Sequence, residues 1–95
     1  MLQRTRFKLT TQQVQDGEIH DLVGDCARIL HVDPPPTYIE PALQVNARIQ
    51  GIAAPVLILN RRLVEEMEPE ELRFVIGHEL AHVRCNHLFM RGIVE

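Results

Sequence analysis

Two histidines and the glutamate between them are the residues of this chain whose types and spacing are best suited to chemistry. His78 and His82 stand four positions apart, and Glu79 directly follows the first of them. On an α-helix this spacing places the two imidazoles about 6 Å apart along the axis and nearly above one another, so both can reach one metal ion. Glu79 points about 100° around the helix, where it can contact a water on the metal without being the natural ligand. The pattern predicts a zinc site with an adjacent base.

The chemistry that this arrangement favours is hydrolysis of a peptide bond. A zinc ion with an open coordination position lowers the pKa of its bound water to about 7. A neighbouring carboxylate can take the proton as hydroxide attacks a carbonyl, and can then pass it to the leaving amine. We therefore expect one Zn²⁺ per chain on His78 and His82, with Glu79 as general base. The alternative is a non-catalytic metal-binding or protein-interaction domain on a peptidase scaffold; such a domain would often have lost the base, so the presence of Glu79 favours the enzyme.

Other side chains near the motif are poorly placed as ligands. At about 100° per residue, His87 lies about 180° around the helix from His78 and cannot join the site if the helix is unbroken. Cys85 faces the same way as His78, but it lies about 10 Å along the axis, which favours packing beside the site over ligation. Glu95 would be about 25 Å from His78 along a continuing helix. The sequence offers no convincing third ligand.

The elements that must position these residues can be read from hydrophobic periodicity and from turn residues. Apolar side chains recur at three- and four-residue steps in the first part of the chain, as in an amphipathic helix, and β-branched residues dominate the middle. The expected elements are an amphipathic helix from Asp16 to His31, strands around Gln44 to Gln50 and Val56 to Leu59 joined through Gly51 to Pro55, a short helix from Arg61 to Met67 capped by Asn60, and a long helix from Pro69 to about Met90. This order predicts a single domain of the α+β class, with a small β-sheet of two or more strands.

Two details of these elements carry further expectations. Thr10 and Gln13 have the spacing of a capping box, which would extend the first helix upstream. Gly77 directly precedes His78, and its small size is expected to let the long helix pack closely against the sheet.

Composition limits the classes of function. The chain has 95 residues, of which 45% are hydrophobic, and a formal net charge of -3, which argues against a nucleic-acid partner. Arg4, Arg6 and Lys8 form the one basic cluster and are read as a solvated terminus without a function. Cys26 and Cys85 have no metal-type spacing. No stretch approaches the roughly 18 apolar residues of a membrane span. We expect a reduced, cytoplasmic chain, and the full-length protein could be associated with a membrane.

Three parts of the sequence resemble a known family of enzymes. Residues Glu71 to Val83 (ELRFVIGHELAHV), followed by Asn86-His87, look like the active-site helix of the M48 family of zinc peptidases. Residues Pro55 to Leu63 (PVLILNRRL) are similar to the strand and short helix that precede it. The pair Asn46-Ala47 resembles the Asn-Ala pair that gluzincin peptidases carry on the sheet edge beside their cleft.

The resemblance implies a zinc-dependent endopeptidase acting on a peptide or protein substrate. His78 and His82 would bind zinc, Glu79 would activate water, and the strand with Asn46 and Ala47 would hold an extended substrate through backbone hydrogen bonds. That last mode has its own physical basis, since an exposed strand edge offers unpaired amide and carbonyl groups to a peptide.

The resemblance also implies that the third zinc ligand is a glutamate from a later helix. Residues 1–95 are therefore expected to be the N-terminal part of a zincin-like metallopeptidase domain. Apolar surface that a C-terminal part would cover is expected to favour self-association.

Overall fold

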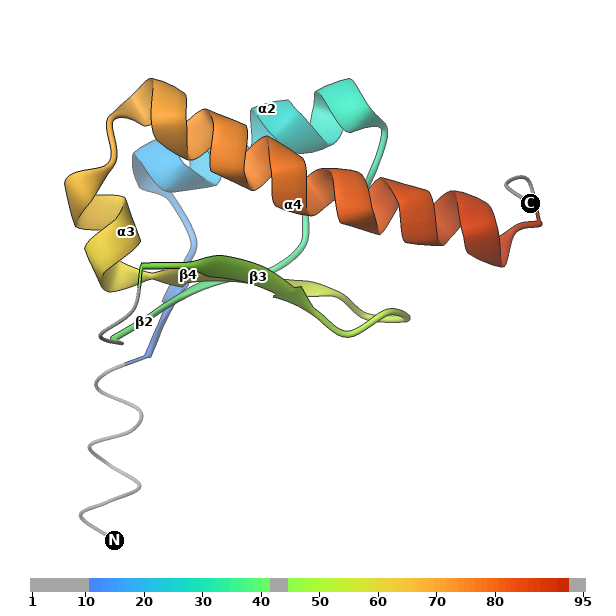
Figure 1. Cartoon of the computed structure of the whole chain (residues 1–95), viewed down its shortest axis with the longest axis horizontal. Coiled ribbons are helices and arrows are strands. Elements are labelled where there is room, and N and C mark those ends of the chain that lie inside the picture. Colours follow the sequence, from blue (N-terminus) through green and yellow to red (C-terminus); the bar gives the residue numbers. More distant parts are fainter. Residues whose placement is uncertain (1–10, 42–44, 93–95) are drawn as a thin grey trace, which may run out of the picture.

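The computed structural model describes residues 11–41 and 45–92, which form a four-stranded sheet with two helices across one face (Figure 1). The elements in chain order are β1 (Gln12–Val14), α2 (Gly17–Leu30), β2 (Thr37–Glu40), β3 (Ala47–Gln50), β4 (Val56–Asn60), α3 (Arg61–Glu66) and α4 (Pro69–Met90). The predicted α+β class is confirmed. The expectations that concern Arg4, Arg6, Lys8, Thr10, Gln44 and Glu95 lie outside the described residues.

The strand order places β3 at an edge of the sheet. The order is β1-β2-β4-β3, with β2 parallel to β4 and the other pairs antiparallel. Central strand β4 buries Leu57 and Leu59 completely. Strand β3 pairs with β4 on one side, and no described strand pairs with its other side. One row of backbone groups on β3 is therefore open.

Two strands were not predicted from the sequence. Residues Gln12–Val14, which the proposed capping box would have made helical, form β1 and pair with β2 instead. Strand β2 itself pairs with β4 in parallel, through Thr37 beside Leu57. Both strands are short and depend on partners that are distant in sequence, so local pattern does not reveal them.

The core lies between the sheet and helices α2 and α4. Its buried side chains are mainly aliphatic: Leu22, Val23, Cys26, Ala27, Leu57, Leu59, Leu63, Leu72, Ile76 and Leu80. Burial raises the pKa of the Cys26 thiol above its ordinary value, while the nearby Arg73 guanidinium opposes the shift. Arg73 also lies 3.7 Å from the Asp25 carboxylate, and Arg84 donates to the His31 carbonyl at 3.3 Å. Apolar packing and these polar contacts fix α4 against α2.

Gly77 lies on the side of α4 that faces α2, which corrects the expectation that it packs against the sheet. A Cβ built at this position would lie 4.0 Å from Cys26 Sγ. The rotation of α4 is set by Leu72, Ile76 and Leu80, which point into the core.

No helix among the described residues is both long and apolar enough to span a bilayer.

The turn between β3 and β4 requires glycine at its first position. Gly51 has a φ of 91°, and a Cβ there would lie 2.9 Å from the carbonyl oxygen of Ala54. We expect Gly51→Ala to lower the free energy of unfolding by about 1–3 kcal/mol, because both the backbone conformation and the contact become unfavourable. Gly24→Ala is the matched control: Gly24 lies within α2 with nothing within 4 Å of the added Cβ, so the change should raise stability by up to about 1 kcal/mol. Chemical denaturation measures both values, and shifts of the same sign would contradict the described turn.

Candidate metal centre

Helix α4 carries the predicted zinc motif without interruption. It runs from Pro69 to Met90, the predicted bounds. Proline suits the first helical position, where its missing N–H has no intrahelical partner to lose. The backbone N–H of Glu68 donates to the Glu71 carboxylate at 3.0 Å, which satisfies one of the free groups at this end. The helix therefore begins at a defined residue and keeps one register through the motif.

His78 and His82 lie side by side on an exposed part of this helix. Their ring centroids are 5.0 Å apart and their planes stand at 88°. Both side chains are exposed, whereas Glu79 is half-buried. Because the core residues of α4 fix its rotation, the two imidazoles remain available to a shared ligand. Within the described ranges, no group of three His, Cys, Asp or Glu side chains comes together as a complete metal site. The structure thus brings the two imidazoles together, with Glu79 half-buried on the same helix.

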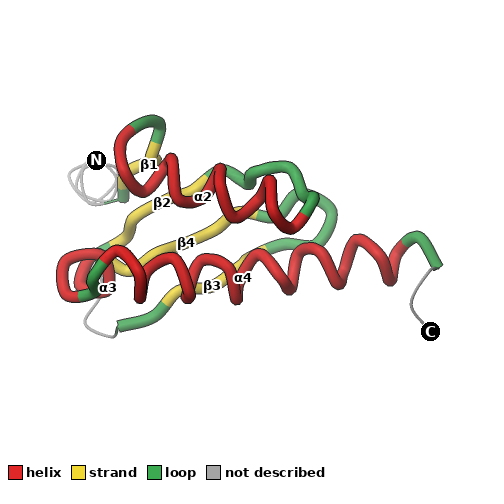
Figure 2. The backbone as a smooth tube through the Cα atoms, turned by 90° about the horizontal axis from the view of Figure 1, so that it is seen from above, coloured by secondary structure: helices red, strands yellow, loops and turns green. Residues whose placement is uncertain are grey.

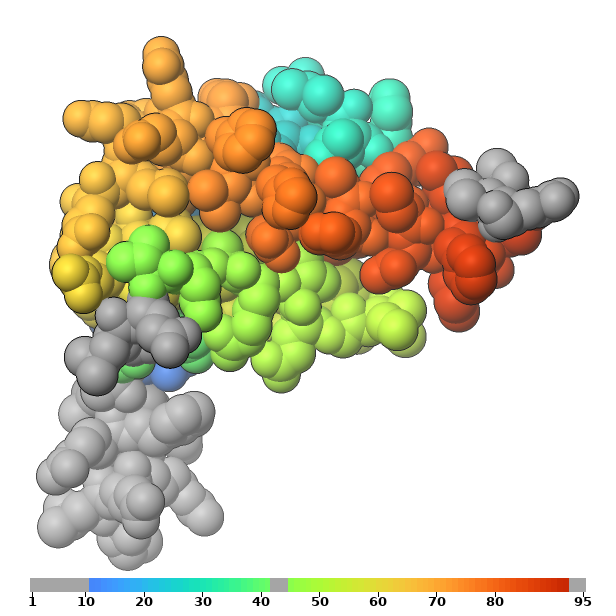
Figure 3. Space-filling model, viewed as in Figure 1, coloured from blue at the N-terminus to red at the C-terminus, as the bar shows by residue number. Residues whose placement is uncertain are grey.

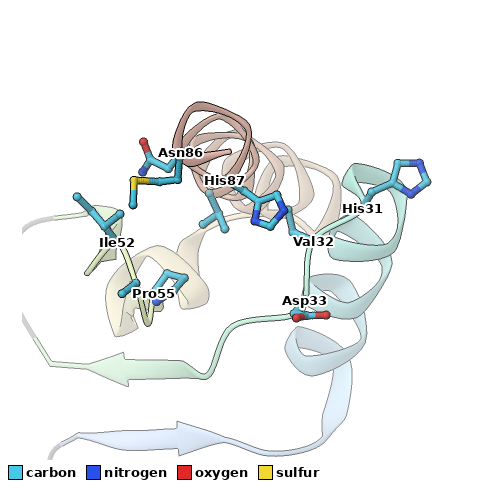
Figure 4. Close-up of a pocket in the computed structure, with 10 residues that line it drawn as sticks. His31, Val32, Asp33, Ile52, Pro55, Asn86 and His87 are labelled. Carbon is cyan, nitrogen blue, oxygen red and sulfur yellow. The ribbon is translucent and has the colours of Figure 1, made fainter. Parts of the chain in front are cut away.

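The other nearby candidates lie elsewhere on α4. His87 lines a cavity beneath the helix together with Val32 and Asp33 (Figure 4). That position agrees with its predicted orientation away from His78. Cys85 is exposed rather than buried beside the histidines, so the packing expected for it is not seen among the described residues.

The edge strand β3 runs alongside α4 in the same chain direction (Figure 2). On the face shown in Figure 3, the helix lies directly above this strand, and no other described segment covers the two. A chain segment lying along the open side of β3 would therefore pass beside the middle of α4.

The register of β3 decides which backbone groups such a segment could meet. The carbonyl of Asn46 accepts a hydrogen bond from the N–H of Asn60 at 3.0 Å, so it is already engaged in the sheet. In an antiparallel pair the backbone groups of alternate residues point away from the partner strand. Ala47 and Ile49 therefore direct their N–H and C=O groups to the open edge. Asn46 contributes only an exposed side chain, which limits the backbone role expected for it. Ile49 was missed, although strand alternation from Ala47 identifies it.

Asn60 ties the start of β3 to the helices that follow. Its side-chain Oδ1 accepts from the N–H of Arg62 at 2.9 Å, which confirms the predicted cap of α3. The residue is fully buried, and its backbone N–H makes the bond to Asn46. This one residue therefore sets both the beginning of α3 and the position of the edge strand.

Comparison with known proteins assigns the chain to a family. The family model described as peptidase family M48 matches residues 13–95. The chain is 27% identical over 89 residues to the plastoglobule-localized metallopeptidase 48, chloroplastic, of Arabidopsis thaliana. The matched stretch covers 92% of this chain and 26% of that protein. It is 38% identical over 77 residues to the protease HtpX of Chromohalobacter salexigens, with 79% of this chain and 26% of that protein covered. A protease HtpX homolog of Aquifex aeolicus is 33% identical over 79 residues, again covering 79% and 26%.

The chain thus spans about a quarter of the length of the curated relatives that it matches. The matched range includes every described element from β2 to α4, and with them the histidine pair and the edge strand. This chain belongs to the M48 family of peptidases.

Proposed function

We propose that this chain supplies the zinc-binding helix, the general base and the substrate-binding strand of a zinc-dependent endopeptidase. The observation that carries the proposal is the pair of exposed imidazoles on His78 and His82, 5.0 Å apart on one uninterrupted helix. Imidazole nitrogens are common zinc ligands, and catalytic zinc sites keep a position open for water. The donors therefore fit the metal, one ion per chain. Membership in a peptidase family supports the same chemistry.

The residues of the chain have distinct roles in this proposal. Zinc, when bound, supplies the Lewis acidity that activates a water molecule. Glu79 accepts the proton of the attacking water and returns it to the nitrogen of the leaving amine. Its backbone is held in place because α4 packs against both the sheet and α2. An extended peptide pairs with the outward backbone groups of Ala47 and Ile49, as an added strand. Asn46 offers its exposed side chain beside that peptide.

A second function uses the same histidines without hydrolysis. A metal-binding or protein-interaction domain on this scaffold would need His78 and His82 but not a base. Glu79 occupies the position that the hydrolytic reaction requires. The relatives that match most of this chain are named as a metallopeptidase and a protease. These observations favour the enzyme.

The proposal extends to partners and location. The substrate is a peptide or protein, and the net charge of -3 gives no general attraction to nucleic acid. Two free cysteines, one of them exposed, support a reducing compartment such as the cytoplasm.

Zinc binding provides the direct test of the site. His78→Ala and His82→Ala are each expected to weaken the apparent zinc affinity by about 100-fold or more. Losing a residue that only hydrogen-bonds to a metal ligand already lowers metal affinity by about 10–100-fold, so losing a ligand itself should cost at least as much. His87→Ala is the matched control, since His87 is an exposed histidine on the same helix that lines a cavity away from His78 and His82. Competition with a chromophoric chelator gives the affinity, and elemental analysis gives the stoichiometry. Equal losses in all three variants would contradict the assignment.

A further inference from the structure

The C-terminal half of α4 carries part of the candidate metal centre but little of the core. The buried residues of this helix end at Leu80, and His82 lies two positions further on. Beyond that point Val83 packs only partly against the core, and it lines a cavity of about 480 Å³ together with His87 and Met90 (Figure 4). The last turns of α4 extend past the other described elements (Figure 1). Packing therefore fixes the helix as far as Leu80 and becomes sparse where His82 must be held.

One side chain ties this half of the helix to the rest of the domain. Arg84 Nη1 donates a hydrogen bond to the backbone carbonyl of His31 at 3.3 Å. Among the residues that the structure describes, no other side-chain hydrogen bond or ion pair joins the part of α4 beyond Leu80 to another element. Arg84 stands two positions after His82, so this contact lies within one helical turn of the candidate ligand.

The acceptor of this hydrogen bond is well suited to a guanidinium group. His31 is the C-cap residue of α2, where the backbone has φ 59° and ψ 46°. Carbonyl groups at this end of a helix lack intrahelical partners and carry the negative end of the helix dipole. A cation there is stabilised both by its charge and by the hydrogen bond. The contact therefore joins the end of α2 to the part of α4 that the core does not hold.

We propose that Arg84 is a positioning residue of the metal centre, which holds the helix beyond Leu80 so that the imidazole of His82 stays directed toward that of His78. This inference rests on the proposed function, because the two imidazoles must share one zinc ion. Ligands of such a site must be held within about 0.5 Å of their productive geometry. Motion of the helix beyond Leu80 reduces the fraction of molecules that meet this condition, and zinc binding weakens accordingly. A purely electrostatic effect would have the opposite sign, since loss of a positive charge near the site strengthens binding of Zn²⁺.

Arg84→Met in the complete natural polypeptide tests this role. Methionine is a good helix former of similar length, but it cannot donate to the His31 carbonyl. We expect zinc affinity to fall by about 3–10-fold, the usual worth of one such hydrogen bond. Arg84→Lys keeps a charged donor and should restore the affinity to within about threefold of the unaltered protein. Competition with a chromophoric chelator gives the affinities, and amide hydrogen exchange in α4 beyond Leu80 should become faster in Arg84→Met alone.

Arg73→Met is the matched control. Arg73 is another α4 arginine that reaches α2, with Nη2 at 3.7 Å from the Asp25 carboxylate. Its neighbours on the helix include the buried residues Leu72 and Ile76, which already fix this part of α4. Zinc affinity should therefore stay within about twofold. Thermal melting of all variants measures global stability, and Arg84→Met should lower the melting temperature no more than Arg73→Met does.

The outcomes separate this role from the proposed function. Unchanged or stronger zinc binding in Arg84→Met would overturn the positioning role and leave the proposed function standing. An equal loss of affinity in Arg73→Met, or a loss that only follows a lower melting temperature, would also overturn it. Zinc binding that survives both His78→Ala and His82→Ala would overturn the proposed function, and the role of Arg84 with it.

Discussion

Glu79→Gln is expected to lower kcat for peptide hydrolysis by about 10²–10⁴-fold, the usual contribution of a positioned general base. Glutamine keeps the shape of the side chain but cannot take a proton from water. His78 and His82 are untouched, so zinc affinity should change by less than about 10-fold. Initial rates with a fluorogenic peptide, measured on the complete natural polypeptide together with zinc content, separate loss of the base from loss of the metal.

Glu70→Gln is the control for this change. Glu70 is an exposed glutamate in the first turn of the same helix, away from the histidines. Its replacement should leave kcat within about twofold, since surface substitutions rarely disturb a distant site. If Glu79→Gln retained most of the activity, another group would have to act as the base. If the unaltered protein bound zinc but cleaved no peptide, the non-catalytic function would be favoured instead.

The second large effect concerns the third zinc ligand. We expect the 95-residue chain to bind zinc on the order of 100-fold more weakly than a chain extended at its C-terminus by the natural sequence. Two histidines alone leave the remaining coordination to water or buffer, whereas catalytic zinc commonly has three protein ligands. Peptide cleavage should rise with the extension as well. Tight zinc binding and full activity in the short chain would show that the third ligand is already present.

The same comparison should reveal a change in association. Phe74 and Phe89 are 76% and 65% exposed, on the part of α4 that also carries the histidines. We propose that this surface is covered in the extended protein, so the short chain should self-associate more strongly. Sedimentation of the two chains at matched concentrations measures the difference. Phe74→Ser should reduce association of the short chain without lowering its zinc affinity, which distinguishes the apolar contact from metal-mediated dimers.

The helix bearing the site could be predicted closely, with its start at Pro69 and its end near Met90, because its signals are local. Pro69 and the two following glutamates mark its beginning, and the periodic apolar residues place it against the core. The cap at Asn60 was equally local and was confirmed. By contrast, β1 and β2 were missed because each is held by a strand far away in the sequence. The prediction that Gly77 faces the sheet was wrong for a related reason: its neighbour Cys26 lies on another helix, far away in the sequence.

The sequence by itself determined that two histidines and a glutamate share one helix, because a four-residue spacing has a fixed meaning on a 3.6-residue turn. It also determined the family resemblance that the comparisons bear out. Only the tertiary structure decided that β3 lies at the edge beside α4, that Ala47 and Ile49 rather than Asn46 offer free backbone groups, and that a cavity opens beyond the histidines. Strand order and register arise from pairing between distant segments, so no local pattern can specify them.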